Sequence, residues 1–232
     1  MSEIKTKKST LLNNDKISNK ELCDRFQNLF TAAVNDVLRE KGLLYQTLPP
    51  EISPLKDNMR ICGIAFTVKG SKNLTLENEM EQRANMLEAL HEDSICVWDT
   101  SGDDESAQWG EVMTMASVLR GCRGAVVDGG VRDTDKVLSQ NFPVFCKYKT
   151  SNGMLGRFRL IDYQIPIQIK SVNIYPGDII FGDIDGVIVI PKVMAYEVLL
   201  EAEQIKENEE EIKKMVLDGL SPKEVVKRGG YF

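Results

Sequence analysis

An arginine and an aspartate stand next to each other, directly after a glycine-rich apolar stretch of the sequence. Arg132 and Asp133 follow residues 124–131, Gly-Ala-Val-Val-Asp-Gly-Gly-Val, which predict a buried strand at 124–127 and a turn at 128–130. An aspartate carboxylate suits Mg²⁺, and an arginine fork can hold a carboxylate or a developing oxyanion. We expect a ligand site here, because open α/β sheets commonly bind ligands beyond the carboxyl ends of their strands. A structural ion pair or a helix cap is the alternative interpretation.

The residue types that the chain lacks narrow the chemistry. His91 is the only histidine, so one chain cannot assemble a Ser-His-Asp triad or a multi-histidine zinc site. No G-x-x-x-x-G-K-[ST] motif is present, and no G-x-G-x-x-G follows a strand-like run, so nucleotide binding has no support. Lys69 and Lys147 are chemically able to form Schiff bases, but nothing near them in the sequence marks either as activated. Carboxylate and arginine chemistry remains, with a hard metal ion as its natural complement.

The composition excludes several other classes of protein. The 232 residues carry a net charge of −6 without a basic stripe, which argues against direct binding of nucleic acid. The polar start lacks the apolar core of a signal peptide, and no run reaches the ~18 apolar residues of a membrane span. We therefore expect a cytoplasmic protein. Five cysteines without a CxxC pair are expected to be reduced and buried: Cys23, Cys62, Cys96, Cys122 and Cys146.

Hydrophobic periodicity predicts the helices that must position the Arg-Asp pair. A capping-box pattern at 18–21 starts a helix that should run to Gly42. Further helices are expected at 78–90, 107–120, from Asp133 to about 140, and 193–217. The helix at 107–120 carries Glu111 in its first turn. Its inward face is predicted to be Trp109, Val112, Met113, Ala116 and Leu119.

The expected strands alternate with these helices. They lie at 61–68, 94–98, 124–127, 143–148 and 165–169, and a hairpin around Asp-Gly occupies 179–190. The loop at 99–106 is dense in carboxylates and either holds a site or is solvated. Together these elements predict one compact α/β domain at 18–220 with a C-terminal helical arm. A flexible tail is expected at 1–17 and another at 221–232.

Four separated segments together resemble the RraA-like family. They are residues 109–133, 63–67, 142–145 and 176–191, and the resemblance covers roughly 20–220. The family includes the 4-hydroxy-4-methyl-2-oxoglutarate / 4-carboxy-4-hydroxy-2-oxoadipate aldolases and the regulator of ribonuclease E activity. The resemblance implies a swivelling β/β/α fold that assembles as a homotrimer or as a hexamer of two trimers, with active sites between subunits.

The aldolase branch of this family carries an acidic residue, twenty intervening residues and then Arg-Asp, a spacing that Glu111, Arg132 and Asp133 meet here. The resemblance implies that Asp133 holds Mg²⁺ or Mn²⁺, directly or through water. It implies that Arg132 is catalytic and binds the substrate oxygen at the breaking bond. Glu111 would be the second catalytic residue and would orient a water on the metal.

Two further parts of the site follow from the same resemblance. The backbone around Gly110, Glu111, Val112 and Met113 would receive the pyruvate carboxylate, consistent with anion binding at helix N-termini. A carboxylate from the C-terminal arm of a neighbouring subunit, either Glu209 or Glu210, would complete the site.

The implied function is a divalent-metal-dependent aldolase that releases pyruvate from 4-hydroxy-4-methyl-2-oxoglutarate-type 2-oxo acids, with decarboxylation of oxaloacetate as a related activity. Both reactions share a pyruvate enolate, and neither needs histidine or a Schiff-base lysine. The alternative is a non-catalytic regulator that binds an RNA-degrading enzyme. Asp133 favours catalysis, because the regulators often lack this aspartate, although Glu111 replaces the aspartate of well-studied aldolases. Methyl transfer is disfavoured, because the chain shows no glycine motif for S-adenosylmethionine.

Overall fold

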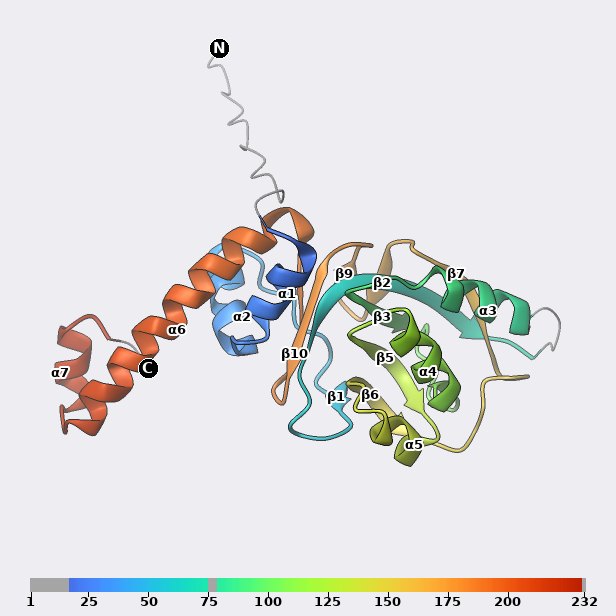
Figure 1. Cartoon of the computed structure of the whole chain (residues 1–232). Helices are drawn as coiled ribbons and strands as arrows, with labels where there is room; N and C mark the ends of the chain where they lie inside the picture. Colours follow the sequence, from blue (N-terminus) through green and yellow to red (C-terminus); the bar gives the residue numbers. More distant parts are fainter. Residues whose placement is uncertain (1–16, 75–78, 231–232) are drawn as a thin grey trace, which may run out of the picture.

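The computed structural model describes residues 17–74 and 79–230, so nearly all of the expected N-terminal tail lies outside the described residues. In the described part, a nine-stranded mixed sheet has the order β1-β6-β5-β3-β2-β10-β11, with β4 on β5 and β7 on β2. Strands β2, β3, β5 and β6 run parallel to one another. Edge strands β1 and β11 approach each other, so the sheet nearly closes (Figure 1).

The strand bounds follow most of the predicted pattern. The predicted hairpin at 179–190 is confirmed, with five register pairs between its two strands, but its turn residues are Ile184 and Asp185 because Gly186 already pairs with Asp183. The strands are β1 (Ser53–Pro54), β2 (Ile61–Lys72), β3 (Ser94–Asp99), β4 (Ala107–Trp109), β5 (Gly124–Val131), β6 (Val144–Lys149), β7 (Phe158–Tyr163), β8 (Ile167–Ile169), β9 (Val172–Ile174), β10 (Ile179–Asp183) and β11 (Gly186–Ile190). Strands β8 and β9 form a separate two-stranded sheet.

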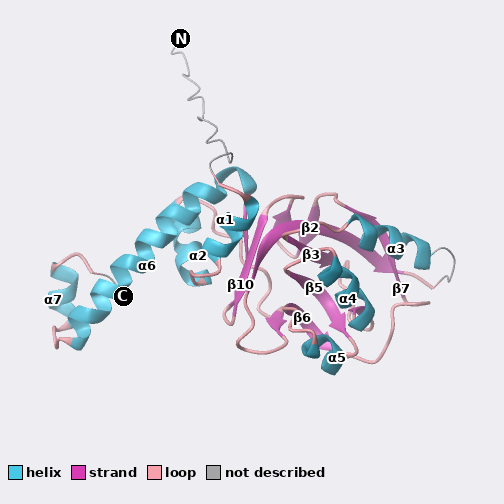
Figure 2. Ribbon diagram, in the orientation of Figure 1, coloured by secondary structure: helices cyan, strands magenta, loops and turns pink. Residues whose placement is uncertain are grey.

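Three hydrophobic layers hold the fold together. Helices α3 (Glu79–Ala89), α4 (Glu111–Leu119) and α5 (Thr134–Ser139) cover one face of the parallel strands (Figure 2). The opposite face packs against β8, β9 and the β10–β11 hairpin. On the outside of that hairpin lie α1 (Asn19–Phe26), α2 (Thr31–Glu40) and the first turns of α6 (Ala195–Leu217). All five cysteines are free and buried, as predicted.

The single helix predicted from 18 to Gly42 is wrong, because two helices occupy this stretch. Helix α1 begins at the predicted N-cap Ser18, and α2 begins again at Thr31. The backbone N–H and the hydroxyl of Thr31 donate to the carboxylate of Asp183, at 2.8 and 2.7 Å. Asp183 is buried in β10, so a partner more than 150 residues away in sequence fixes the start of α2.

The helix predicted at 107–120 begins later than expected. Residues Ala107–Trp109 form β4 beside β5, and α4 starts only at Glu111. The buried face of α4 also differs from the predicted one. Thr114 and Ser117 are buried, whereas Val112 is 72% and Leu119 85% exposed. The prediction that Val112 and Leu119 point inward is therefore wrong, and both apolar side chains lie on the surface of the chain.

The C-terminal arm projects away from the sheet (Figure 1). Helix α6 leaves the body after its buried first turns and ends beside α7 (Pro222–Lys227), which has a capping box at Ser221 and Glu224. The stretch expected as a C-terminal tail thus contains a helix in its described part. Within the described residues, no helix is both long and apolar enough to cross a membrane.

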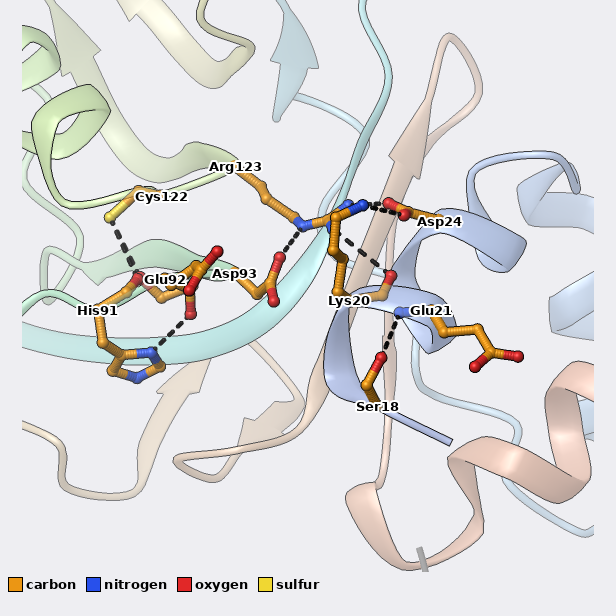
Figure 3. Close-up of polar contacts among 10 residues, drawn as sticks. Ser18, Lys20, Glu21, Asp24, His91, Glu92, Asp93, Cys122 and Arg123 are labelled. Atoms are coloured by element: carbon orange, nitrogen blue, oxygen red, sulfur yellow. Dashed lines mark hydrogen bonds and ion pairs between the residues drawn. The ribbon is translucent and has the colours of Figure 1, made fainter. Parts of the chain in front are cut away.

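Arg123 ties α1 to the start of β5, the strand that leads to the predicted site. Its guanidinium donates to Asp93 at 2.6 Å and to Asp24 on α1 at 2.7 Å (Figure 3). The Arg123 and Asp93 side chains are only 15% and 16% exposed. The hydrogen bonds from Lys20 and Arg123 lower the pKa of Asp24.

Replacing Arg123 with methionine should lower the free energy of unfolding by about 3 kcal/mol, because Asp93 then stays mostly buried without its partner. Denaturant titration measures the loss. Lys213→Met is the control, since the Lys213–Glu210 pair is exposed on both sides and such pairs contribute about 0–1 kcal/mol. The hydrogen bonds to Asp24 also contribute to the free energy of unfolding. This contribution should be complete above the carboxyl pKa of the unfolded chain, about 4, and be lost as pH falls through the lower pKa of Asp24 in the folded protein. Equal losses in the two variants would contradict this role of Arg123.

Candidate active site

A cavity of about 440 Å³ lies where α3, β4, α4 and the end of β5 meet. All the residues predicted for the site within one chain contribute to its lining: Gly110, Glu111, Val112, Met113, Arg132 and Asp133. The remaining walls are mostly apolar and come from α3, β4 and the loop at 153–155, with Met80, Arg83, Ala84, Leu87, Ala107, Gln108, Trp109, Gly153, Met154 and Leu155. The structure therefore gathers the predicted residues, and their chemical roles stay predictions.

The glycines before the Arg-Asp pair lie within a strand and not in the predicted turn. Strand β5 continues to Val131, with a shift in its pairing to β6 between Val127 and Gly130. Such irregularities re-aim the chain and occur often beside active sites. A Cβ on Gly129 would overlap the side-chain amide of Gln108, and one on Gly130 would lie 2.5 Å from the ring of Tyr148. Both positions therefore need glycine for close packing.

A buried polar network that the sequence did not reveal holds this irregular strand. Gln108 is fully buried, and its Oε1 accepts from the Gly130 N–H at 2.9 Å. Its Nε2 donates to Asp103 at 2.6 Å, and the same carboxylate accepts from the Ser106 hydroxyl. Asp103 and Ser106 belong to the acidic loop at 99–106. That composition was the available signal, but the contact with Gln108 could not be read from it.

Arg132 and Asp133 face the cavity with free capacity for a ligand. Arg132 Nε lies 3.5 Å from Asp133 Oδ2, and the two side chains are 52% and 43% exposed. An ion pair this exposed contributes about 0–1 kcal/mol. Asp133 occupies the N-cap position of α5 in a left-handed conformation, with φ 52°, but its side chain makes no capping hydrogen bond. The helix-cap interpretation therefore fails, whereas the ion pair is present but is too exposed to contribute much stability.

Gly110 lets the start of α4 approach the Arg-Asp pair. A Cβ at this position would lie 3.0 Å from Asp133 Oδ2 and 3.3 Å from Arg132 Cγ. Gly110 is also the N-cap of α4 and has no side chain that could cap the first amides of the helix. Unsatisfied N–H groups at a helix N-terminus attract carboxylates and phosphates. The cavity thus combines a helix N-terminus without a side-chain cap, a guanidinium and a carboxylate.

The donor set fits a hard, mostly hydrated cation. Asp133 offers carboxylate oxygens, and the described residues contain no group of three or more His, Cys, Asp or Glu side chains that could enclose an ion. Mg²⁺ commonly binds through one or two carboxylates and keeps several waters, whereas structural zinc needs four protein ligands. The residues present therefore suit Mg²⁺ or Mn²⁺.

The proposed arm carboxylates lie outside this cavity in a single chain. Glu209 and Glu210 are on α6, and Glu210 pairs with Lys213 at 2.8 Å. Figure 1 shows α6 beyond β10, beside α1 and α2 and away from α4. Either residue would reach such a site only in another subunit.

The fold is that of an α/β protein with a cavity beside the end of a core strand. The RraA-like family model, described as Aldolase/RraA, matches residues 31–189. The chain therefore belongs to the RraA-like family. The expected α/β fold is confirmed by a solved structure that is 50% identical, with a TM-score of 0.82, and covers 84% of this chain and 88% of its own. That structure is described as "novel cellulases from microbes associated with the gut ecosystem".

Two relatives extend the comparison at lower identity. Protein DlpA of Legionella pneumophila is 32% identical over 214 residues, which are 92% of this chain and 34% of DlpA. The chain therefore spans about a third of the length of DlpA. A Halalkalibacterium halodurans protein named "Putative 4-hydroxy-4-methyl-2-oxoglutarate aldolase" is 33% identical over 200 residues, 84% of this chain and 89% of that protein.

Proposed function

We propose that this protein is a divalent-metal-dependent aldolase that releases pyruvate from 4-hydroxy-4-methyl-2-oxoglutarate-type 2-oxo acids. One observation carries the proposal: Arg132, Asp133 and the uncapped start of α4 line one cavity. Its volume of about 440 Å³ is within the range of small-molecule sites. The name of the Halalkalibacterium halodurans relative supports the same substrate class.

The reaction assigns a task to each group in the cavity. In the retro-aldol direction the C4 hydroxyl loses its proton, the C3–C4 bond breaks, and its electron pair moves toward the 2-oxo oxygen as pyruvate enolate. The first amides of α4 bind the 2-oxo acid's carboxylate, and Arg132 stabilises the oxygen on which charge develops. Glu111 positions the water that takes the hydroxyl proton. Mg²⁺ or Mn²⁺ held by Asp133 would polarise the 2-oxo group. Oxaloacetate decarboxylation needs the same stabilisation.

Arg83 on α3 makes the cavity suitable for a second carboxylate. It is the other arginine that lines the cavity, whose nearby walls are Met80, Leu87 and Met154. A distal carboxylate buried against this mostly apolar wall would be costly without a partner, and the Arg83 guanidinium can supply one. A substrate with a methyl group in its place would leave the guanidinium unused, so the cavity can distinguish the two. This arrangement favours dicarboxylate substrates.

Arg83→Met should lower kcat/KM for 4-hydroxy-4-methyl-2-oxoglutarate about 10²-fold, because a charge-assisted hydrogen bond contributes about 1.5–3 kcal/mol. It should barely change kcat/KM for 4-hydroxy-2-oxopentanoate, which lacks the distal carboxylate. Steady-state kinetics on both substrates measure the ratio. An equal loss on both would show that Arg83 acts on the fold and not on specificity.

The reaction itself is tested by following pyruvate release, coupled to lactate dehydrogenase. The wild-type protein is given 4-hydroxy-4-methyl-2-oxoglutarate or oxaloacetate, with Mg²⁺ and separately with Mn²⁺. We expect turnover of the aldol substrate and slower turnover of oxaloacetate. Absence of turnover with both Mg²⁺ and Mn²⁺ would reject the proposal and favour the protein-binding regulator.

The description of the 50% identical structure makes glycoside hydrolysis a second candidate. Such hydrolases need two carboxylates across the bond, and Glu111 and Asp133 both line the cavity. However, Asp133 lies beside Arg132, and Trp109, the cavity's aromatic residue, is only 1% exposed and gives no stacking surface for a sugar. We expect no reducing sugar from carboxymethyl cellulose, and its release would overturn this ranking.

The exposed apolar residues around the cavity support assembly as a homotrimer or hexamer. Met80, Val112 and Leu155 lie at the cavity and are 66%, 72% and 49% exposed. Large exposed apolar side chains that gather in one place mark interaction sites. A neighbouring subunit over this cavity would exclude water from it and bring Glu209 or Glu210 close.

A further inference from the structure

A second cavity of about 590 Å³ lies at the carboxyl-terminal parts of the four parallel strands. Lys69 of β2, Asp99 of β3, Asp128 of β5 and Lys147 of β6 line it. None of the four lines the Arg132 cavity. A neighbouring hollow of about 300 Å³ shares Lys69 and Asp99. The carboxyl ends of parallel strands are where α/β sheets commonly bind ligands, and the proposed aldolase site does not use this space.

Two of the lysines that line this second cavity are each paired with an aspartate on the neighbouring strand. Lys69 Nζ lies 2.6 Å from Asp99 Oδ2, and Lys147 pairs with Asp128. The sequence had singled out both lysines as nucleophile candidates without placing them together. The pairing gives them another task, because in these ion pairs both lysines act as hydrogen-bond donors.

The two kinds of charge differ in how far they reach into the cavity. The Asp99 and Asp128 side chains are 3% and 7% exposed, whereas those of Lys69 and Lys147 are 32% and 27% exposed. Asp99 also accepts from the backbone N–H of Ser101 at 2.8 Å and of Gln168 at 3.3 Å. The carboxylates are therefore turned inward, and Asp99 is held by three donors of its own protein.

What remains available to a ligand is a set of hydrogen-bond donors. An ammonium has three donors and no acceptor, and each pairing uses one of them. Lys170 adds a third ammonium and Glu51 a carboxylate, both from exposed positions of the lining. Paired lysines whose carboxylates lie behind them present positive ends to the cavity, and charge-assisted hydrogen bonds to an anion are the strong ones.

We propose that this cavity binds a small carboxylate or phosphate anion through Lys69 and Lys147, with Lys170 at its rim. The site is separate from the Arg132 cavity, although Asp128 and Arg132 lie four residues apart on the same stretch of chain. The proposal holds whether or not the protein is an aldolase.

Protection of lysines from acylation tests the proposal on the wild-type protein. The protein is treated with an acetylating ester in physiological salt, with inorganic phosphate or succinate raised into the millimolar range, and modification is read by mass spectrometry. At an anion concentration three times Kd, the rates at Lys69 and Lys147 should fall about fourfold. Exposed Lys136 and Lys213 are the internal controls. Equal rates with and without both anions, or equal changes at all lysines, would overturn the proposal.

The two anions distinguish the ligand classes, and variants locate the site. Protection by phosphate alone identifies a phosphate-bearing ligand, and protection by succinate alone identifies a carboxylate.

In Arg132→Ala, protection should persist. The Lys69→Met/Asp99→Asn double variant removes one ammonium without leaving a buried charge, and calorimetry should show about tenfold weaker anion binding. Lys72→Met on the same strand, whose pair with Asp104 is exposed, should bind normally. Unchanged anion binding in a folded double variant would reject the site. If the double variant does not fold, the protection experiment on the wild-type protein decides.

Discussion

Replacing Arg132 with alanine should lower kcat for pyruvate release about 10²–10³-fold, the usual loss when one oxyanion donor is removed. Arg132 is half exposed, and its Nε lies 3.5 Å from Asp133 Oδ2. The substitution should therefore change the free energy of unfolding by less than about 1 kcal/mol. Steady-state kinetics with Mg²⁺ and a denaturant titration measure both quantities.

The matched control for this prediction is Arg157→Ala. Arg157 is an exposed arginine whose guanidinium donates to the Gly153 carbonyl at 3.2 Å, close to the cavity but outside its lining. The Arg157→Ala substitution should leave kcat nearly unchanged. Arg132→Lys should recover only part of the activity, because lysine keeps the charge but not the planar fork. A fully active Arg132→Ala enzyme would contradict the assigned role.

Replacing Asp133 with asparagine should abolish metal-dependent turnover, with a loss in kcat of about 10³-fold or more. A cation in the site supplies several kcal/mol of charge stabilisation, and each 1.36 kcal/mol changes a rate tenfold. The substitution keeps the side-chain size and removes the charge. Binding of Mn²⁺ to the protein, followed by electron paramagnetic resonance, should weaken in parallel with kcat.

Asp135→Asn is the control for Asp133. Asp135 stands in the first turn of the same helix, and its side chain is 81% exposed. Both Mn²⁺ affinity and kcat should be unchanged in this variant. If Asp133→Asn binds Mn²⁺ as tightly as the wild type, Asp133 is not the metal ligand.

Local signals predicted the centre of the candidate site. Arg132 and Asp133 are adjacent in sequence and follow a core strand, so their proximity needs no long-range contact. The family resemblance assigned Glu111 and the adjacent helix N-terminus to the site. In the structure they line the same cavity as Arg132 and Asp133, because β4, which precedes them, pairs with β5. The hairpin at 179–190 was equally local, since the two-residue turn Ile184-Asp185 determines its register.

Features that depend on distant partners were missed. The break between α1 and α2 depends on Asp183, and the strand β4 depends on pairing with β5. The extension of β5 through Gly130 depends on Gln108. In each case a long-range hydrogen bond overrides the local pattern. The Lys69 and Lys147 cavity belongs to the same group, because only the parallel order of β2, β3, β5 and β6 brings its pairs together.

The most direct test of the proposed function is metal readdition to the wild-type protein. The protein is stripped with EDTA and assayed for pyruvate release from 4-hydroxy-4-methyl-2-oxoglutarate before and after Mg²⁺ is restored. We predict no release above the uncatalysed rate without metal and full recovery with Mg²⁺ or Mn²⁺. Equal pyruvate release with and without the metal would contradict the metal-dependent aldolase.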